Sequence, residues 1–217
     1  MIIAIDGPAG SGKSTTARLL AEKLNYIYLD SGAMYRAVTL FFLRNNIDLT
    51  NHLDILNALE EINLKIDYKS NNFNVYVQNE NVNDSIRDEK ININVSNISE
   101  ISEIRKKMVK LQRNFSTNKN IVIEGRDIGS HVFPNAEFKF YVDANIKVRA
   151  ARRIKDVSNS SKISLDEMCE QLLKRDKIDS NRDISPLIKP EDAIVVDTTF
   201  LSIEEQVIEL FNIITNN

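Results

Sequence analysis

The octapeptide GPAGSGKS at residues 7–14 restricts the fold of this chain more than any other feature of its sequence. It matches the pattern G-x-x-x-x-G-K-[ST], in which backbone N–H groups of a glycine-rich loop surround a polyphosphate and the lysine reaches the terminal phosphates. A β-branched run at 2–6 precedes it and a helical apolar period at 14–24 follows, which disfavours a glycine turn without a ligand. The pattern predicts a strand, a loop and a helix that together bind a nucleoside triphosphate.

Strand-like and helix-like segments alternate along the rest of the chain. Apolar runs predict strands at residues 26–29 and 193–197, and strands of the buried type at 120–124 and 138–143. Helical periods and capping boxes predict helices at residues 31–45, 53–61, 101–117, 146–155, 164–178 and 202–214. Strands that alternate with helices are typical of a mainly parallel sheet with right-handed crossovers.

One stretch departs from this alternation. Residues 63–68 and 73–78 switch between apolar and polar side chains, with turn-type residues between them, which predicts an antiparallel hairpin. We therefore expect a small β-containing insert at about 62–100. Two charged helices flank a polar loop at 156–163, which is typical of a lid, here about 156–178, although a solvated helix pair is the alternative. The core of a single unit, residues 1–217, would then comprise 1–61, 101–155 and 179–217.

The charge balance and composition exclude several classes of protein. The chain has 28 basic and 31 acidic residues and a net charge of −3, which argues against bulk nucleic-acid binding. A single cysteine, Cys169, cannot form an internal disulfide, and no apolar run approaches the roughly 18 residues of a membrane span. The N-terminus lacks the basic segment of a secretory signal. We expect a cytoplasmic monomer whose partners are small molecules, with neither nucleic acid nor membrane among them.

Glycine is scarce in this chain, and all of its occurrences fall in three candidate ligand motifs. They are Gly7, Gly10, Gly12, Gly32, Gly125 and Gly129. Average usage would place roughly 15 glycines in a chain of this length. Because glycine adopts left-handed backbone conformations without strain, we expect all three motifs to need that freedom.

The second and third motifs follow predicted strands and carry groups suited to anions. DSGAMYR at 30–36 offers a hydroxyl, a phenol and Arg36, and a capped helix with a surface arginine is the alternative. EGRDIG at 124–129 offers Arg126 for a phosphate and Asp127 for an amino group or a metal-bound water, and an ion pair that fixes the loop is the alternative. Because ligands lie beyond the carboxyl ends of parallel strands, both motifs would share one sheet edge with the phosphate loop.

Further arginines lie on the two charged helices that we expect to form the lid. The first of these helices carries Arg149, Arg152 and Arg153. In the second, Arg175, Asp179 and Arg182 recur at spacings of four and three residues. These three side chains would share one helical face if the helix continues that far.

Together these motifs resemble those of the bacterial cytidylate kinase family, and the similarity extends over essentially the whole chain. With the β-rich insert, it is carried by GPAGSGKST at 7–15, DSGAMYR at 30–36, IRKKMVKLQR at 104–113, EGRDIGSHVFP at 124–134 and KRDKIDSNR at 174–182. The resemblance implies an α/β fold of the P-loop NTPase type, with three layers, a five-stranded parallel sheet and helices on both faces. It also implies phosphorylation of CMP and dCMP by ATP with Mg²⁺, by direct in-line transfer without a covalent intermediate.

The resemblance also implies roles for individual residues. The ATP phosphates would be bound by Gly7, Pro8, Ala9, Gly10, Ser11, Gly12, Lys13, Ser14 and Thr15, with Arg153. Mg²⁺ would be held by Ser14, partly through water. CMP would be bound by Ser31, Tyr35, Arg36, Ser96, Arg105, Arg126, Asp127, Arg175, Asp179 and Arg182. The catalytic residues would be Lys13, Arg126, Asp127 and Arg182. Ser180 stands where some members of the family have arginine, and no role is carried over to it.

Two other functions stay open on the sequence. Another small-molecule kinase with the same loop, such as one for shikimate, is disfavoured by the insert and by DSGAMYR. A nucleotide-gated switch would carry an N-K-x-D guanine-binding motif, and the nearest match, NKNI at 118–121, fails at its last position.

Overall fold

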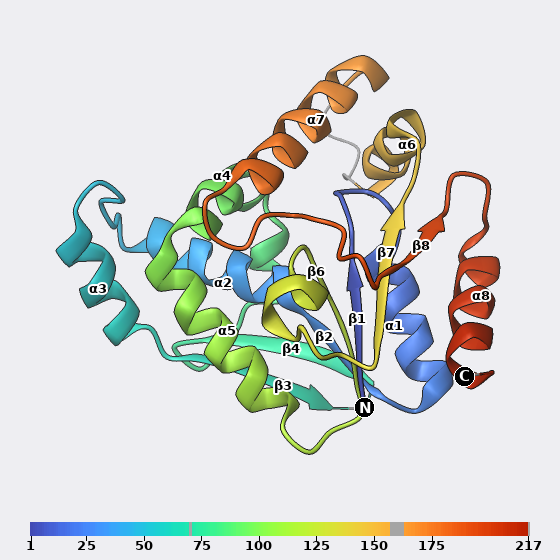
Figure 1. Cartoon of the computed structure of the whole chain (residues 1–217). Helices are drawn as coiled ribbons and strands as arrows, with labels where there is room; N and C mark the ends of the chain where they lie inside the picture. The colour runs from blue at the N-terminus through green and yellow to red at the C-terminus, as the bar shows by residue number, and fades with distance from the viewer. Residues whose placement is uncertain (70, 157–162, 217) are drawn as a thin grey trace. The chain divides into compact units, whose positions relative to one another are not determined.

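A computed structural model describes residues 1–69, 71–156 and 163–216 of the chain. The chain divides into two compact units (Figure 1). The first unit contains Met1–Ile27 and Lys119–Asn217, and the second contains Tyr28–Asn118. Within the described ranges, no helix combines the length and the apolar character needed to cross a membrane.

The main sheet has five parallel strands in the order β2-β6-β1-β7-β8. The strands are β1 (Ile2–Asp6), β2 (Ile27–Asp30), β6 (Ile121–Gly125), β7 (Phe138–Asp143) and β8 (Ile194–Asp197). The central strand β1 pairs with β6 on one side and with β7 on the other, and its last residue, Asp6, lies opposite Gly125 and Tyr141. The predicted parallel α/β sheet is confirmed, and the predicted strand boundaries differ from the observed ones by at most one residue. The phosphate loop therefore begins where the central strand ends.

The helices of the first unit are α1 (Lys13–Leu24), α6 (Ile146–Asp156), α7 (Leu165–Asn181) and α8 (Ile203–Thr215). Helix α1 packs against α8, and α6 packs against α7 (Figure 1). Both predicted capping boxes are present, with Ser164 opening α7 and Ser202 opening α8. Helix α7 ends three residues later than predicted, at Asn181 rather than near 178. This extension carries Asp179 on the helix and leaves Arg182 directly at its end.

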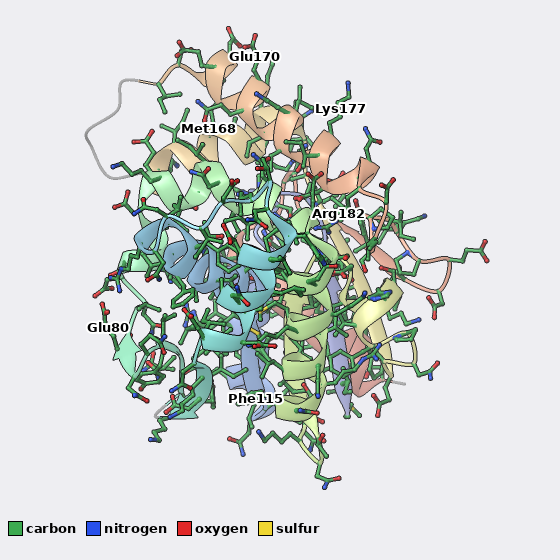
Figure 2. The ribbon with its side chains drawn as sticks, turned by 90° about the vertical axis from the view of Figure 1, so that its left-hand side faces the viewer. Glu80, Phe115, Met168, Glu170, Lys177 and Arg182 are labelled. Carbon is green, nitrogen blue, oxygen red and sulfur yellow. The ribbon has the colours of Figure 1, made fainter. Side chains whose placement is uncertain are left out.

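The side chains of α7 divide between a packed side and a solvent side. Met168 and Leu172 are buried in a small apolar cluster with Ala9 of the phosphate loop and Ala150 of α6, and Cys169 packs partly against it. Glu170 and Lys177 are exposed and point away from the helix, whereas Arg182 at its end is buried (Figure 2). This contact gives Cys169 a packing role.

The second unit combines helices with a small antiparallel sheet. Its elements are α2 (Ser31–Arg44), α3 (His52–Glu61), β3 (Leu64–Lys69), β4 (Asn72–Val77), β5 (Glu80–Asn81), the 3₁₀ turn η1 (Ser85–Arg87), α4 (Glu89–Glu100) and α5 (Ser102–Ser116). The predicted hairpin is confirmed as β3 and β4, which pair from Leu64–Val77 to Lys69–Asn72, and β5 extends the sheet. Helix α4 was not predicted, because its sequence is rich in asparagine and isoleucine, which are weak helix formers. The side chain of Asp88 caps this helix by accepting the Lys90 N–H.

The glycines behave differently from the expectation. Among the described residues, the glycines with positive φ are Gly7, Gly10 and Gly12, all in the phosphate loop. Gly7 has a φ of 151°, and a Cβ there would lie 2.0 Å from the Val142 carbonyl oxygen, so no other residue fits. Gly32 and Gly129 need space instead, because a Cβ would lie 3.0 Å from Arg36 Nη1 at the first and 3.2 Å from the Lys139 side chain at the second. The expectation of left-handed backbone in all three motifs is therefore wrong for the second and third.

Candidate active site

The phosphate loop is folded around the beginning of α1. Gly12 occupies the N-cap position and Lys13 is the first helical residue, so the N–H groups of the first turn have no partner within the helix. These N–H groups and the helix dipole favour an anion at this end. The Lys13 side chain is buried, and its Nζ donates to the Pro8 carbonyl at 3.1 Å and lies 4.0 Å from Glu124 Oε2. Ser14 and Thr15 are exposed on the same turn.

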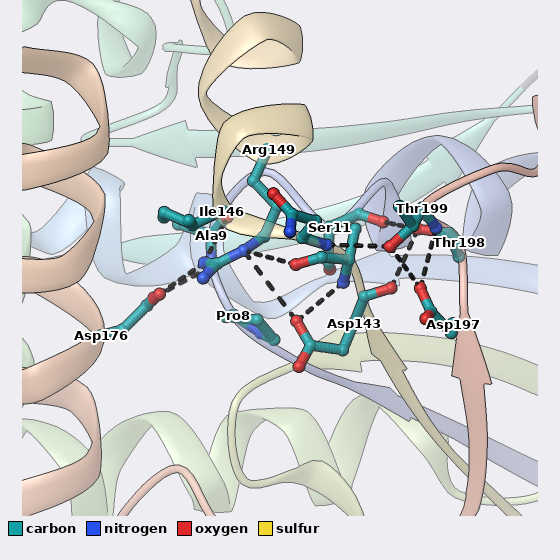
Figure 3. Close-up of polar contacts among 12 residues, drawn as sticks. Pro8, Ala9, Ser11, Asp143, Ile146, Arg149, Asp176, Asp197, Thr198 and Thr199 are labelled. Atoms are coloured by element: carbon teal, nitrogen blue, oxygen red, sulfur yellow. Dashed lines mark hydrogen bonds and ion pairs between the residues drawn. The ribbon is translucent and has the colours of Figure 1, made fainter. Parts of the chain in front are cut away.

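The first half of the loop is held by an ion pair between α6 and α7 (Figure 3). Arg149 of α6 donates from Nη1 to the Ala9 carbonyl at 3.2 Å and to Asp176 Oδ2 at 2.5 Å. Asp176 of α7 also accepts the Ala9 N–H, on Oδ1, at 3.2 Å. Both backbone polar groups of Ala9, its N–H and its carbonyl, are therefore satisfied by side chains that are distant in sequence.

The second half of the loop is held by side chains from α6 and from the segment that follows β8. The Thr198 hydroxyl donates to the Ser11 carbonyl at 2.8 Å (Figure 3). Arg152 Nη1 donates to the same carbonyl at 3.2 Å. Thr16 of α1 donates to Gln206 Oε1 of α8 at 2.7 Å. Arg149 and Arg152 of the basic helix α6 thus bind carbonyl groups of the phosphate loop. Arg153 lies on the next position of α6 and is half-buried.

Three arginines surround one buried carboxylate in the first unit. Asp179 accepts from Arg126 Nε at 3.0 Å, and its oxygens lie 4.0 Å from Arg175 Nε and 3.9 Å from Arg182 Nη1. Burial opposes ionisation of this carboxyl group, but the three guanidinium groups outweigh it and hold the pKa of Asp179 below its usual value. The predicted grouping of Arg175, Asp179 and Arg182 is thus present, and Arg126 joins it from the end of β6.

The turn after Arg126 is anchored by the central strand. A π-helical turn, η2 (Ile128–Val132), follows Asp127, which is buried. Asp6, at the end of β1, accepts the Ile128 N–H at 2.9 Å and the Gly129 N–H at 2.7 Å. Burial raises the pKa of Asp6 to about 7, although the two N–H groups lower it in part. No sequence pattern identified this role for Asp6, since the consensus of the loop begins at Gly7.

In the second unit, Asp30 organises the start of the DSGAMYR motif. Its Oδ1 caps α2 by accepting the Ala33 N–H at 2.7 Å, and its Oδ2 accepts from Arg36 Nη2 at 2.9 Å. Ser31 is the buried first residue of the helix. The alternative of a capped helix is therefore correct as local structure. The guanidinium of Arg36 remains about a fifth exposed, so it keeps access to solvent and to a ligand.

A second polar group of this unit joins α2, α4 and α5. The buried guanidinium of Arg105 lies over the Tyr35 ring, with 5.4 Å from Cζ to the ring centroid. Arg105 Nη1 donates to the Ser99 carbonyl at 3.0 Å, and the Ser99 hydroxyl donates to the Ser96 carbonyl at 2.8 Å. The structure thus brings together three residues predicted for CMP, Tyr35, Ser96 and Arg105, and adds Ser99, which no motif had indicated.

These features define the class of the protein. A phosphate loop between the central strand of a parallel sheet and the first turn of a helix is typical of the nucleotide site of a P-loop protein that binds nucleoside triphosphates. Solved structures agree on the fold: a gluconokinase from Sinorhizobium meliloti has a TM-score of 0.50 at 13% identity, covering 99% of this chain and 91% of that one. An uncharacterised protein from Eubacterium ventriosum has a TM-score of 0.55 at 13% identity, covering 100% of this chain and 99% of that one.

The family model described as cytidylate kinase matches residues 3–216, and the chain belongs to that family.

Curated relatives support the same assignment over nearly the full length. The cytidylate kinase of Clostridioides difficile is 44% identical, covering 97% of this chain and 96% of the relative. That of Fusobacterium nucleatum is 47% identical, covering 94% and 93%, and that of Carboxydothermus hydrogenoformans is 45% identical, covering 99% and 97%. The predicted family, the enzyme class and the phosphorylation of CMP and dCMP are confirmed, with ATP as the nucleotide that the family implies.

Proposed function

We propose that this chain transfers the γ-phosphoryl group of ATP directly to the phosphate of CMP or dCMP, giving ADP and CDP or dCDP without a covalent intermediate. The observation that carries the proposal is the group of Arg126, Arg175 and Arg182 around buried Asp179, on the same unit as the phosphate loop. Phosphoryl transfer needs little covalent help from a protein, because its barrier falls through in-line positioning and charge neutralisation. A set of arginines and one lysine supplies these effects.

The donor side would be the phosphate loop, residues 7–15, with Arg153. Lys13 would neutralise charge on the transferred group, and the N–H groups at the start of α1 would bind the phosphate oxygens. Mg²⁺ keeps several waters and phosphate oxygens as ligands, so one exposed hydroxyl from the protein, that of Ser14, fits its requirements. When bound, the ion would reduce the negative charge of the phosphates, and Ser14 would hold it partly through water.

The acceptor side would use the residues that the family resemblance implies. Arg36 and Arg126 would bind the CMP phosphate, and Ser31 and Tyr35 would line the acceptor pocket. Cytosine presents one amino donor and two acceptors on its pairing edge. A carboxylate with a guanidinium and a hydroxyl can therefore recognise it, and we assign these roles to Asp127, Arg105 and Ser96. Asp179, with Arg175 and Arg182, would contact the ribose side, and Lys13, Arg126, Asp127 and Arg182 would form the catalytic set.

Two segments would complete the site. Residues 62–100 would form the insert that binds the monophosphate, and residues 156–178 a lid that closes in each turnover and excludes water. Part of the proposed lid, 157–162, lies outside the described residues. We further propose that the enzyme acts as a cytoplasmic monomer.

A substrate panel tests the proposal. ADP release should be followed in a coupled assay with ATP, Mg²⁺ and CMP, dCMP, UMP, AMP, GMP or shikimate as acceptor. CMP and dCMP should give the highest kcat/KM, because the cytosine amino group can donate to Asp127 while its two acceptors face Arg105 and Ser96. Uracil has no amino group to donate, and adenine has only one acceptor beside its amino group. Rates with UMP or AMP that equal or exceed the CMP rate would overturn the assignment of the base-reading residues. Slow hydrolysis that no monophosphate changes would favour a nucleotide-gated switch.

A further inference from the structure

Asp6 makes a contact that neither the phosphate-loop motif nor the proposed catalytic set explains. It is the last residue of the central strand β1, immediately before Gly7, and it is 2% exposed. Its two oxygens are used separately: Oδ1 accepts the Ile128 N–H at 2.9 Å and Oδ2 accepts the Gly129 N–H at 2.7 Å. The bonded residues are separated from Asp6 by 122 and 123 positions in the chain.

The bonded N–H groups belong to the first two residues of the π-helical turn η2. The first N–H groups of a helical turn lack partners within it, and an aspartate at the N-cap position normally satisfies them. Here the N-cap position is held by Asp127, whose side chain makes no capping bond. Asp6 performs the capping from a different strand.

Burial of the Asp6 carboxyl group lowers the stability of the folded chain when that group is ionised. A buried carboxyl group is costly to ionise, and burial raises the pKa of Asp6 to about 7. The charged groups around it are Asp127, which raises its pKa further, and Arg126, which lowers it, while Tyr141 lies opposite it on β7 and the Lys139 stem packs against Gly129. Buried groups with perturbed pKa values concentrate at functional sites.

We propose that Asp6 is a positioning residue for the acceptor nucleotide: it fixes the turn that carries Arg126 and Asp127 and joins that turn, through the end of β1, to the phosphate loop. The geometry of the acceptor groups is thereby set relative to the geometry of the donor loop within one unit. This inference rests on the acceptor roles proposed above for Arg126 and Asp127.

The variant Asp6→Asn tests the proposal, with Glu137→Gln as its matched control. Glu137 accepts the Ile2 N–H at 2.7 Å, so the control makes the same carboxylate-to-amide change at the opposite end of β1. An asparagine at position 6 keeps one acceptor and turns an NH₂ group toward the second N–H. A displacement of about 1 Å at reacting groups costs up to about a hundredfold in rate, so kcat/KM for CMP should fall about 10- to 100-fold.

A comparison of KM for CMP with KM for ATP distinguishes a positioning role of Asp6 from general destabilisation of the protein. In Asp6→Asn, KM for CMP should rise while KM for ATP stays near the wild-type value, and the control should change neither. Equal losses for ATP and CMP, or wild-type CMP kinetics in a folded variant, would overturn the proposal. The variant Asp127→Ala, measured in parallel, separates the proposed acceptor role of Asp127 from the proposed positioning role of Asp6. Normal CMP kinetics in Asp127→Ala would refute the acceptor role. Normal CMP kinetics in Asp6→Asn alone would refute only the positioning role.

A measurement on the wild-type protein covers the case in which Asp6→Asn does not fold. The amide signals of Ile128 and Gly129 should titrate by NMR with a midpoint near pH 7, as the accepting carboxylate becomes protonated. The dissociation constant of cytidine, a probe without a phosphate to titrate, should rise over the same range as pH falls. Amide signals that titrate while cytidine affinity stays constant would overturn the proposal.

Discussion

Replacing Asp179 by asparagine should destabilise the protein strongly, because it removes the one negative charge that three buried or half-buried arginines share. At an effective dielectric constant of about 20, an ion pair at the 3.0 Å of Arg126–Asp179 is worth about 5.5 kcal/mol, and each pair near 4.0 Å about 4 kcal/mol. Desolvation of several kcal/mol per ion and repulsion among the arginines offset much of this attraction. Removal of one partner from a buried pair costs about 3–5 kcal/mol, which we expect for Asp179→Asn.

Urea unfolding followed by circular dichroism at pH 7.5 measures this loss. The matched control is Glu80→Gln, since Glu80 pairs with Arg44 at 2.7 and 3.1 Å but both side chains are about half exposed. Water screens such a pair, so the control should leave the urea midpoint almost unchanged. A loss below about 1 kcal/mol for Asp179→Asn would refute the reasoning, because that is the range of an exposed pair.

The same variant carries two further signatures. The pKa of Asp179 is lowered in the folded state, so its contribution to stability is present above the unfolded value of 3.8 and is lost as pH falls through the folded value. The difference between wild type and Asp179→Asn should therefore shrink in acid. In addition, inorganic phosphate should stabilise the variant more than the wild type, because three guanidinium groups then lack their carboxylate. An equal response to phosphate would contradict the view that these arginines form an anion site.

Three other predictions concern the loop, the acceptor turn and the strand end. Lys13→Ala should lower kcat by at least about a hundredfold, because phosphate charge goes unneutralised, while CMP binding measured by calorimetry persists. Asp127→Ala should raise KM for CMP with little change in ATP affinity, as checked by initial rates and equilibrium binding; unchanged CMP kinetics would refute its role. The pKa of Asp6 is raised from 3.8 to about 7 in the folded state. Its ionisation therefore lowers the stability of the wild type as the pH rises from 3.8 to about 7. Asp6→Asn should lack that fall, and parallel pH dependences in urea unfolding would count against the shifted pKa.

Much of the fold was predictable from sequence because its elements carry strong local patterns. Strands β1 and β6 are apolar, rich in β-branched residues and buried, as is typical of strands in the middle of a parallel sheet, and the boundaries of β7 were predicted without error. The capping boxes at Ser164 and Ser202 fixed where α7 and α8 begin. Helix α4 escaped prediction because its residues favour other conformations, and its stability comes from packing of Ile91, Val95 and Ile98.

The candidate site was predictable only where a residue stands in a recognisable motif or at a helical spacing. Lys13, Arg36 and Asp127 stand in such motifs, and the cluster around Asp179 followed from helical spacing. Asp6 was invisible because its partners lie more than 120 positions away, and nothing local distinguishes it from any aspartate that ends a strand. The glycine expectation failed for a related reason: scarcity indicates that a glycine is needed, but only the structure separates a need for left-handed backbone from a need for space.

The supports of the phosphate loop explain why its conformation is not a property of the motif alone. A glycine-rich loop has high conformational entropy when unfolded, so holding it in one shape requires compensating contacts. These contacts come from positions 140 to 190 residues later, where Arg149 and Thr198 bind loop carbonyls and Gln206 receives the Thr16 hydroxyl. Because the donors are aligned before the phosphates arrive, binding need not pay for ordering the loop. The C-terminal third thus fixes the shape of a loop at the opposite end of the sequence.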